Sequence, residues 1–270
     1  MKALRRTISI ALISAMFLSG CATVPITGRK QLVLIPHSEL QALSADNYRQ
    51  IVAESKLSSN KQDIKTVQNI GRKIALSTEN FLRENGMSNM LGYFAWEFTL
   101  IEDETANAFA LPGGKVAVYS GILKYTQNED GLAVVIAHEA AHVIANHGGE
   151  RLSQMMLAQF GHTMLTQALE EKTQTTKEFL MLAYGVSMNL GIVLPYSRLH
   201  EKEADRIGLI LMAQAGYNPR EAIPFWERMN NAGKGARNLE FLSTHPAPET
   251  RINDIKTYLP EALKHFNKLK

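Results

Sequence analysis

The sequence has very little cysteine: Cys21 is the single one among 270 residues. One cysteine cannot form an internal disulfide, so a disulfide-stabilised scaffold is excluded. It also cannot supply a zinc site built from thiolates, which needs at least two of them. Any metal chemistry in this chain therefore depends on histidine and carboxylate ligands.

The chain also lacks a real excess of charge. Its formal net charge of +3 comes from 29 basic and 26 acidic side chains. Three of the basic residues, Lys2, Arg5 and Arg6, lie within residues 1–20, which contain no acidic residue. Without that segment the chain has 26 basic and 26 acidic side chains, so the basic surface typical of a nucleic-acid partner is excluded.

Residues 1–20 have the pattern of a secretory signal. The basic start is followed by an uncharged, largely apolar stretch from Thr7 to Gly20. This stretch is too short for a convincing membrane span. We expect a signal peptide over 1–20.

The signal ends in Leu18-Ser19-Gly20-Cys21, which resembles a bacterial lipobox with Cys21 as the lipidated residue. In the lipoproteins that this resembles, an Asp after the cysteine favours the inner membrane, and here the residue is Ala22. We therefore expect a lipidated N-terminus and linker over 21–37, and a bacterial envelope protein anchored through Cys21. Its expected location is the outer membrane, facing the periplasm.

Long hydrophobic runs are absent after the signal. Two uncharged stretches, Leu152–Leu169 and Phe179–Pro195, are apolar but are interrupted by polar residues. They are better interpreted as buried or groove-lining helices than as membrane spans.

The remaining pattern predicts one mostly helical domain over 38–270. Helical spacing of apolar residues covers 38–58 and 61–85. A strand is expected over Phe94–Ile101, and two further strands are expected around the turn Pro112-Gly113-Gly114. The fold class is therefore α+β, with a small mixed sheet.

The strongest chemical signal is His138-Glu139-Ala140-Ala141-His142. On a helix, residues four apart share a face, so His138 and His142 can bind one zinc ion. Glu139 is then placed to act as general base toward a metal-bound water. Because the flanking residues are apolar nearly all round, these polar groups would be costly to bury without a metal partner.

The helix that carries this motif has clear candidate ends. Asn128 or Asp130 can cap its start, and Gly148-Gly149 can end it. His147 is out of register for a third ligand of the extended motif, so we interpret it as a helix-end residue.

A later helix offers the third ligand. Ser197 can cap this helix and Gly216 can end it. Glu201 and Asp205 lie four residues apart on one face, so Glu201 can bind the metal while Asp205 orients a ligand histidine. Glu203 points about 200° away around the helix.

Three motifs together resemble the HtpX-like, CAAX-prenyl-protease-like zinc endopeptidases. They are His138–His142, the Ser-Arg-x-x-Glu-x-x-Ala-Asp form of 197–205, and Asn107–Gly114. The string Thr27-Gly28-Arg29-Lys30-Gln31 is similar to the Oma-type and bacterial lipoprotein branch. The resemblance covers roughly residues 25–260 and implies a zincin-like catalytic domain with one zinc ion per chain.

The resemblance also implies roles for single residues. His138, His142 and Glu201 match the zinc ligands, Glu139 the catalytic base, and Asp205 an acid behind the ligands. Four residues match an edge strand beside the cleft, to which an extended substrate could add: Asn107, Ala108, Phe109 and Ala110.

Near the C-terminus, His245 matches a donor to the oxyanion of the reaction. Its alternative is a plain loop histidine before a proline. Arg251 could partner either Asp205 or Glu203.

These patterns predict a zinc endopeptidase that cleaves proteins of the cell envelope, most simply misfolded or unassembled ones. The alternative is a latent protease that acts mainly as a chaperone-like quality-control factor, with the helices of 152–195 covering its cleft. Nothing in the sequence indicates an oligomeric state.

Overall fold

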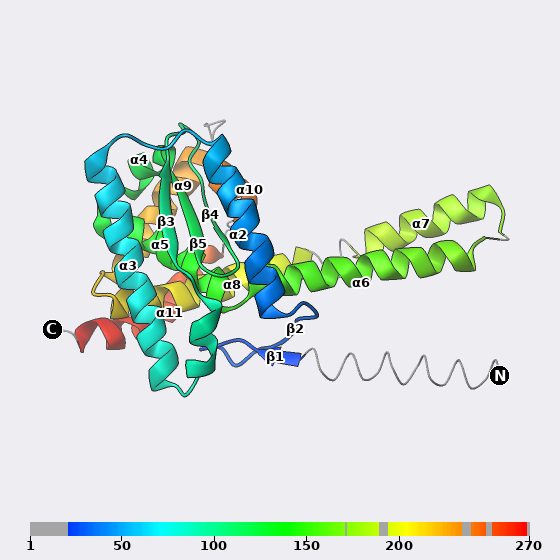
Figure 1. Ribbon diagram of the computed structural model, residues 1–270, viewed down its shortest axis with the longest axis horizontal. Helices are drawn as coiled ribbons and strands as arrows, with labels where there is room; N and C mark the ends of the chain where they lie inside the picture. The colour runs from blue at the N-terminus through cyan, green and yellow to red at the C-terminus, as the bar shows by residue number, and fades with distance from the viewer. Residues whose placement is uncertain (1–20, 171, 189–193, 234–238, 247–249, 269–270) are drawn as a thin grey trace.

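The computed structural model describes residues 21–170, 172–188, 194–233, 239–246 and 250–268 (Figure 1). The predicted signal peptide, residues 1–20, lies outside the described residues. The strands are β1 (Cys21–Thr23), β2 (Lys30–Leu32), β3 (Glu97–Ile101), β4 (Ala108–Leu111) and β5 (Lys115–Tyr119). The helices are α2 (His37–Glu54), α3 (Lys61–Glu84), α4 (Leu123–Thr126), α5 (Glu129–Ile144), α6 (His147–Ala168), α7 (Gln174–Met188), α8 (Leu194–Gln214), α9 (Ala222–Gly233), α10 (Glu240–Thr244) and α11 (Arg251–Asn267).

The main sheet has three strands in the order β3-β5-β4. β3 runs parallel to β5, and β4 runs antiparallel to it across the turn that contains Gly113 and Gly114. Both glycines have positive φ, 86° and 87°, which other residues rarely adopt. The mostly helical α+β class and the mixed sheet are confirmed, and β4 is an edge strand of this sheet.

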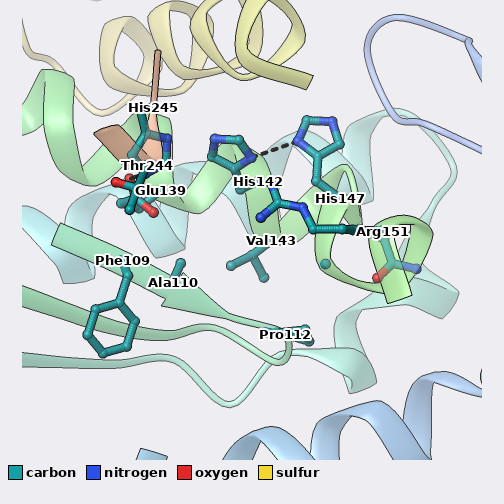
Figure 2. Close-up of a pocket in the computed structure, with 12 residues that line it drawn as sticks. Phe109, Ala110, Pro112, Glu139, His142, Val143, His147, Arg151, Thr244 and His245 are labelled. Carbon is teal, nitrogen blue, oxygen red and sulfur yellow. Dashed lines mark hydrogen bonds and ion pairs between the residues drawn. The ribbon is translucent and has the colours of Figure 1, made fainter. Parts of the chain in front are cut away.

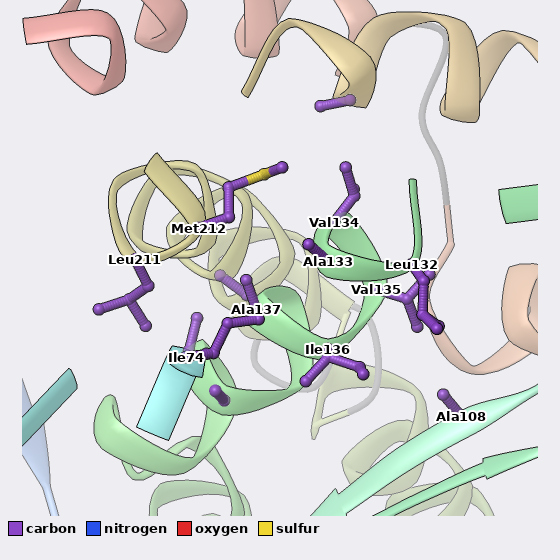
Figure 3. Close-up of a cluster of buried hydrophobic side chains, with 14 of the residues drawn as sticks. Ile74, Ala108, Leu132, Ala133, Val134, Val135, Ile136, Ala137, Leu211 and Met212 are labelled. Atoms are coloured by element: carbon purple, nitrogen blue, oxygen red, sulfur yellow. The ribbon is translucent and has the colours of Figure 1, made fainter. Parts of the chain in front are cut away.

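The core surrounds α5, which is buried along almost its whole length. Its apolar residues pack against α3, the sheet and α8 (Figure 3). Gly208 of α8 lies against the backbone of Ala137 and His138, where an added Cβ would sit 3.1 Å from main-chain atoms. This close approach places α8 directly beside the helix that carries the histidine motif.

Both ends of α5 can be compared with their predictions. Asn128 caps the start, and its side chain accepts a hydrogen bond from the Gly131 amide. The predicted end at Gly148-Gly149 is wrong, because the helix stops at Ile144 and Asn146 adopts a left-handed conformation with φ 53°. Both glycines instead lie in the first turn of α6.

The predicted cap of α8 is also wrong. The helix begins at Leu194, so Ser197 lies inside its first turn. Its end is as predicted, because Gly216 has a φ of 89° just after the last helical residue. The amide of Tyr217 then bonds back to the carbonyl of Met212.

Helices α6 and α7 form a hairpin that projects from the body of the molecule (Figure 1). Several of its large apolar side chains are exposed: Met155, Met156, Phe160, Met164, Phe179 and Leu182. Of the two expectations for 152–195, buried or groove-lining helices, burial is therefore wrong for these exposed residues. Among the described residues, no helix is long and apolar enough to cross a membrane.

The N-terminal segment is a small hairpin in which β1 pairs antiparallel with β2. Val24 is buried in the main core, and the Leu34 amide donates to Ser153 Oγ of α6 at 2.8 Å. The segment predicted as a linker therefore contacts the domain at Val24 and at Leu34.

Candidate active site

The residues predicted as metal ligands meet at one buried point. His138 and His142 come from α5, and Glu201 comes from the adjacent α8. His138 Nε2 lies 3.1 Å from His142 Nε2 and 3.2 Å from Glu201 Oε2, while His142 Nε2 lies 3.4 Å from Glu201 Oε1. These three side chains, with His245, form a group that can hold one metal ion.

The spacing of this group fits zinc. Four donors at about 2.0 to 2.1 Å from a tetrahedral zinc ion lie about 3.3 Å from one another, close to the separations seen here. Both Nδ1 atoms have partners elsewhere, so both Nε2 atoms face the carboxylate of Glu201. A cation between these electron-rich atoms removes their repulsion. Burial lowers the pKa of His142 to about 3, which keeps its ring in the neutral form that binds metal.

Asp205 lies behind the first ligand, as predicted. Its Oδ1 accepts from His138 Nδ1 at 3.0 Å and from Arg251 Nη2 at 2.7 Å. The Arg251 guanidinium stacks 3.5 Å above the Trp226 ring and lies 3.4 Å from Glu201 Oε2. Of the two partners considered for Arg251, the structure selects Asp205.

Glu139 lies on the open side of the ligand group. Its side chain is 2% exposed, and its Oε1 lies 3.3 Å from His245 Nε2. The nearby backbone of Ala110 in β4 favours the charged form of its carboxylate. Burial raises the pKa of Glu139, partly offset by the nearby histidines, and a raised pKa suits a carboxylate that must accept and return a proton.

His245 follows α10. Its ring lies within hydrogen-bonding distance of the metal-fitting donors, closer to them than a residue that only donates to the oxyanion would need to be. Its Nδ1 lies 3.2 Å from His138 Nε2 and 3.2 Å from both oxygens of Glu201. The ring thus lies between the ligands and Glu139, with one nitrogen directed at each. The alternative of a plain loop histidine does not describe this position.

A pocket of about 220 Å³ opens beside these groups (Figure 2). Among its lining residues are Phe109, Ala110, Glu139, His142, Thr244 and His245. The predicted substrate strand lines this pocket only in part, because Asn107 and Ala108 are buried in the body of the domain. Phe109 and Ala110 are the two members of that set that line the pocket.

A second buried cluster, which the sequence patterns do not predict, adjoins the site. His147 is the first residue of α6, and its Nδ1 lies 2.8 Å from His142 Nδ1. Its Nε2 lies 3.0 Å from Glu203 Oε2, so His147, which does lie at a helix end, also belongs to a buried polar cluster. The one sequence signal for this cluster was the string that contains Arg29, which pairs with both Glu150 and Glu203.

This site has the arrangement of a metal-dependent peptidase: His138, His142 and Glu201 belong to a group that could hold one metal ion, and the buried Glu139 lies beside them. Residues 65–259 match the family model for peptidase family M48. The chain therefore belongs to peptidase family M48, whose members use zinc.

Curated relatives support this membership. The chain is 36% identical over 243 residues to the mitochondrial metalloendopeptidase OMA1 of Schizosaccharomyces pombe, covering 88% of this chain and 66% of that protein. It is 39% identical to the same protein of Saccharomyces cerevisiae, covering 73% of this chain and 56% of that one. The beta-barrel assembly-enhancing protease of Escherichia coli is 29% identical, over 60% of this chain and 34% of its own length.

The chain thus spans between a third and two thirds of the length of these relatives. The predicted location on a bacterial outer membrane is contradicted, because the fungal relatives that match most of the chain are mitochondrial proteins. Lipidation of Cys21 stays a prediction from the sequence.

Proposed function

We propose that this chain is a zinc-dependent endopeptidase that hydrolyses peptide bonds in protein substrates. The observation that carries the proposal is the juxtaposition of a metal-fitting group, His138, His142 and Glu201, with the buried carboxylate of Glu139. His142 of this group and Glu139 line the same pocket beside an edge strand.

Each residue then has a definite role. His138, His142 and Glu201 hold the ion, and Asp205 keeps the His138 ring oriented. Zinc, when bound, polarises the peptide carbonyl and lowers the pKa of a water molecule. Glu139 accepts the proton of the attacking water and passes it to the nitrogen of the peptide bond as that bond breaks. His245 is placed to donate a hydrogen bond to the carbonyl oxygen as negative charge develops there.

The pocket supports a preference for extended chains. β4 is an edge strand, and its residues Phe109 and Ala110 line the pocket next to Glu139. A substrate segment that pairs with β4 would be held as an additional strand with its backbone beside the base. Since folded proteins rarely offer an unpaired strand, we propose unfolded or unassembled proteins as the substrate class.

The alternative of a latent, chaperone-like protein depended on helices covering the cleft. In the structure, the described parts of α6 and α7 beyond Arg151 extend away from the body that holds the pocket (Figure 1). This placement supports an open protease over the latent alternative.

The experiment compares cleavage of one protein in its folded and its unfolded form by the purified chain. We expect the unfolded form to be cleaved, cleavage to stop with a chelator, and cleavage to return when zinc is added. Zinc-independent cleavage would contradict the proposal, and so would a chain that binds zinc at one ion per chain but cleaves neither form.

A further inference from the structure

The N-terminal segment reaches two buried carboxylates close to the metal-fitting group. Arg29 forms a two-pronged pair with Glu150, Nη1 to Oε1 at 2.9 Å and Nη2 to Oε2 at 2.7 Å. Its Nε donates to Glu203 Oε2 at 2.9 Å, and the Thr27 hydroxyl donates to the other oxygen of Glu203. One guanidinium thus joins α6 to α8 and holds both carboxylates in place.

Glu203 in turn orients His147. A carboxylate paired with arginine can only accept, so His147 Nε2 carries the proton in its 3.0 Å hydrogen bond to Glu203 Oε2. The His147 ring is 1% exposed and stacks on the His200 ring, with centroids 4.2 Å apart and an interplanar angle of 14°. The ring therefore has one position and, as a neutral imidazole, one tautomer.

That tautomer determines the proton on the ligand. Because Nε2 of His147 bears its proton, Nδ1 of His147 is an acceptor, 2.8 Å from His142 Nδ1. His142 must then donate from Nδ1, which leaves its Nε2 lone pair directed at His138 and Glu201. The opposite tautomer of His142 would place a proton where the ion has to bind.

We infer that His147 and Glu203, anchored by Arg29, are positioning residues that fix His142 in the tautomer able to bind metal. The inference rests on the proposed role of His142 as a ligand. His142 then has its own supporting residue, His147, just as His138 is supported by its contact with Asp205. It also makes the segment 21–34 part of the metal site, although that segment touches no ligand.

A pair of substitutions at one position tests this inference in the full-length chain. Histidine-selective nitrogen NMR of the metal-free protein reports which ring nitrogen of His142 carries the proton, and chelator competition reports zinc affinity. His147→Phe keeps an aromatic ring against His200 but removes the acceptor, so we expect mixed tautomers and zinc binding weakened about 10- to 100-fold. In His147→Asn the amide oxygen can replace Nδ1 as acceptor, so tautomer and zinc affinity should return close to wild type.

A second pair tests the connection to the N-terminal segment. Arg29→Ala should weaken zinc binding by about three- to tenfold, since Glu203 then keeps fewer partners. Arg206→Ala is the matched control. It removes a comparable two-pronged pair, with Glu261, from α8, the helix that also carries Glu203. We expect zinc affinity in this control to equal that of wild type.

The inference is overturned if His147→Phe keeps the wild-type tautomer of His142 and the wild-type zinc affinity. If that variant does not fold, equal zinc affinity of Arg29→Ala and Arg206→Ala overturns it instead. The NMR comparison is made without metal and without substrate. It therefore decides the tautomer question even if the wild-type chain proves to have no proteolytic activity, which would count against the proposed function alone.

Discussion

The Nδ1 atom of His138 lies 3.0 Å from Oδ1 of Asp205, while Nε2 of the same ring faces the other metal-fitting donors. Asp205 is one helical turn beyond Glu201, so α8 supplies both a proposed ligand and the group that contacts the His138 ring from behind. Arg251 holds the Asp205 carboxylate from the far side at 2.7 Å. The metal-fitting group is thus bordered by two buried charged residues, Asp205 and Arg251, that lie outside the group itself.

Replacing Asp205 tests this support. Asp205→Asn keeps the size of the side chain but removes the negative charge shared with Arg251, so His138 becomes a weaker and less fixed ligand. We expect zinc affinity, measured by chelator competition, to fall about 10- to 100-fold. Asp254→Asn, which removes a surface partner of Lys202, should bind zinc like wild type. Unchanged affinity in Asp205→Asn would show that the contact is only structural.

His142→Ala tests the ligand set. Removing one of three protein donors should reduce bound zinc well below one ion per chain, as measured by elemental analysis of the dialysed protein. His162→Ala is the matched control, because His162 is exposed on α6 and far along the hairpin from the site. A His142→Ala protein that keeps a full zinc ion would exclude His142 as a ligand.

His245→Ala separates two contributions of this residue. The proposed ligands His138, His142 and Glu201 all remain in this variant, so we expect zinc to stay bound at one ion per chain. Loss of a donor to the oxyanion should lower the cleavage rate by about 100-fold or more. Thr244→Ala, which alters the neighbouring lining residue, should change the rate little. A rate equal to or above wild type in His245→Ala would instead show that His245 acts as a fourth ligand that limits access of water.

Acid should weaken the attachment of the N-terminal segment. Burial opposes ionisation of Glu150, yet hydrogen bonds from His200 and Arg29 hold the pKa of this carboxyl below its ordinary value of 4.5. A lowered pKa stabilises the folded chain fully above that ordinary value, and the stabilisation is lost as pH falls through the folded-state pKa. Glu150→Gln should therefore cost about 1 to 3 kcal/mol of unfolding free energy at pH 7.

The same variant gives the test of this pH dependence. The difference in melting temperature between wild type and Glu150→Gln should be largest at neutral pH and should shrink as the pH is lowered below 4.5. A difference that stays constant over this range would contradict the proposed ion pair. Because the comparison follows unfolding, it needs no substrate.

Much of the site could be predicted from sequence, because its key spacings are local. His138, Glu139 and His142 lie on one helical turn, and Glu201 and Asp205 lie on another, so helical geometry alone groups them. The strands on either side of Gly113-Gly114 could also be predicted from the sequence, because the turn and the two apolar segments are contiguous.

The second cluster could not be predicted in this way. Arg29 meets Glu150 and Glu203 across 121 and 174 residues of sequence, and no periodicity connects positions so far apart. The end of α5 was misplaced because Asn146 adopts the left-handed conformation, so the chain turns before the glycines that seemed to end the helix. That early turn is what brings His147 back onto His142.

Glu139→Gln gives the most direct measurement of the central claim. The amide keeps the size of the side chain and leaves His138, His142 and Glu201 intact, but it cannot accept a proton. Zinc content and cleavage of an unfolded protein should be measured together on wild type and variant. We predict one zinc ion per chain in both proteins, and a cleavage rate lowered by about 100- to 10,000-fold in the variant. Equal cleavage by wild type and Glu139→Gln would contradict the assignment of this site as a zinc endopeptidase centre with Glu139 as its base.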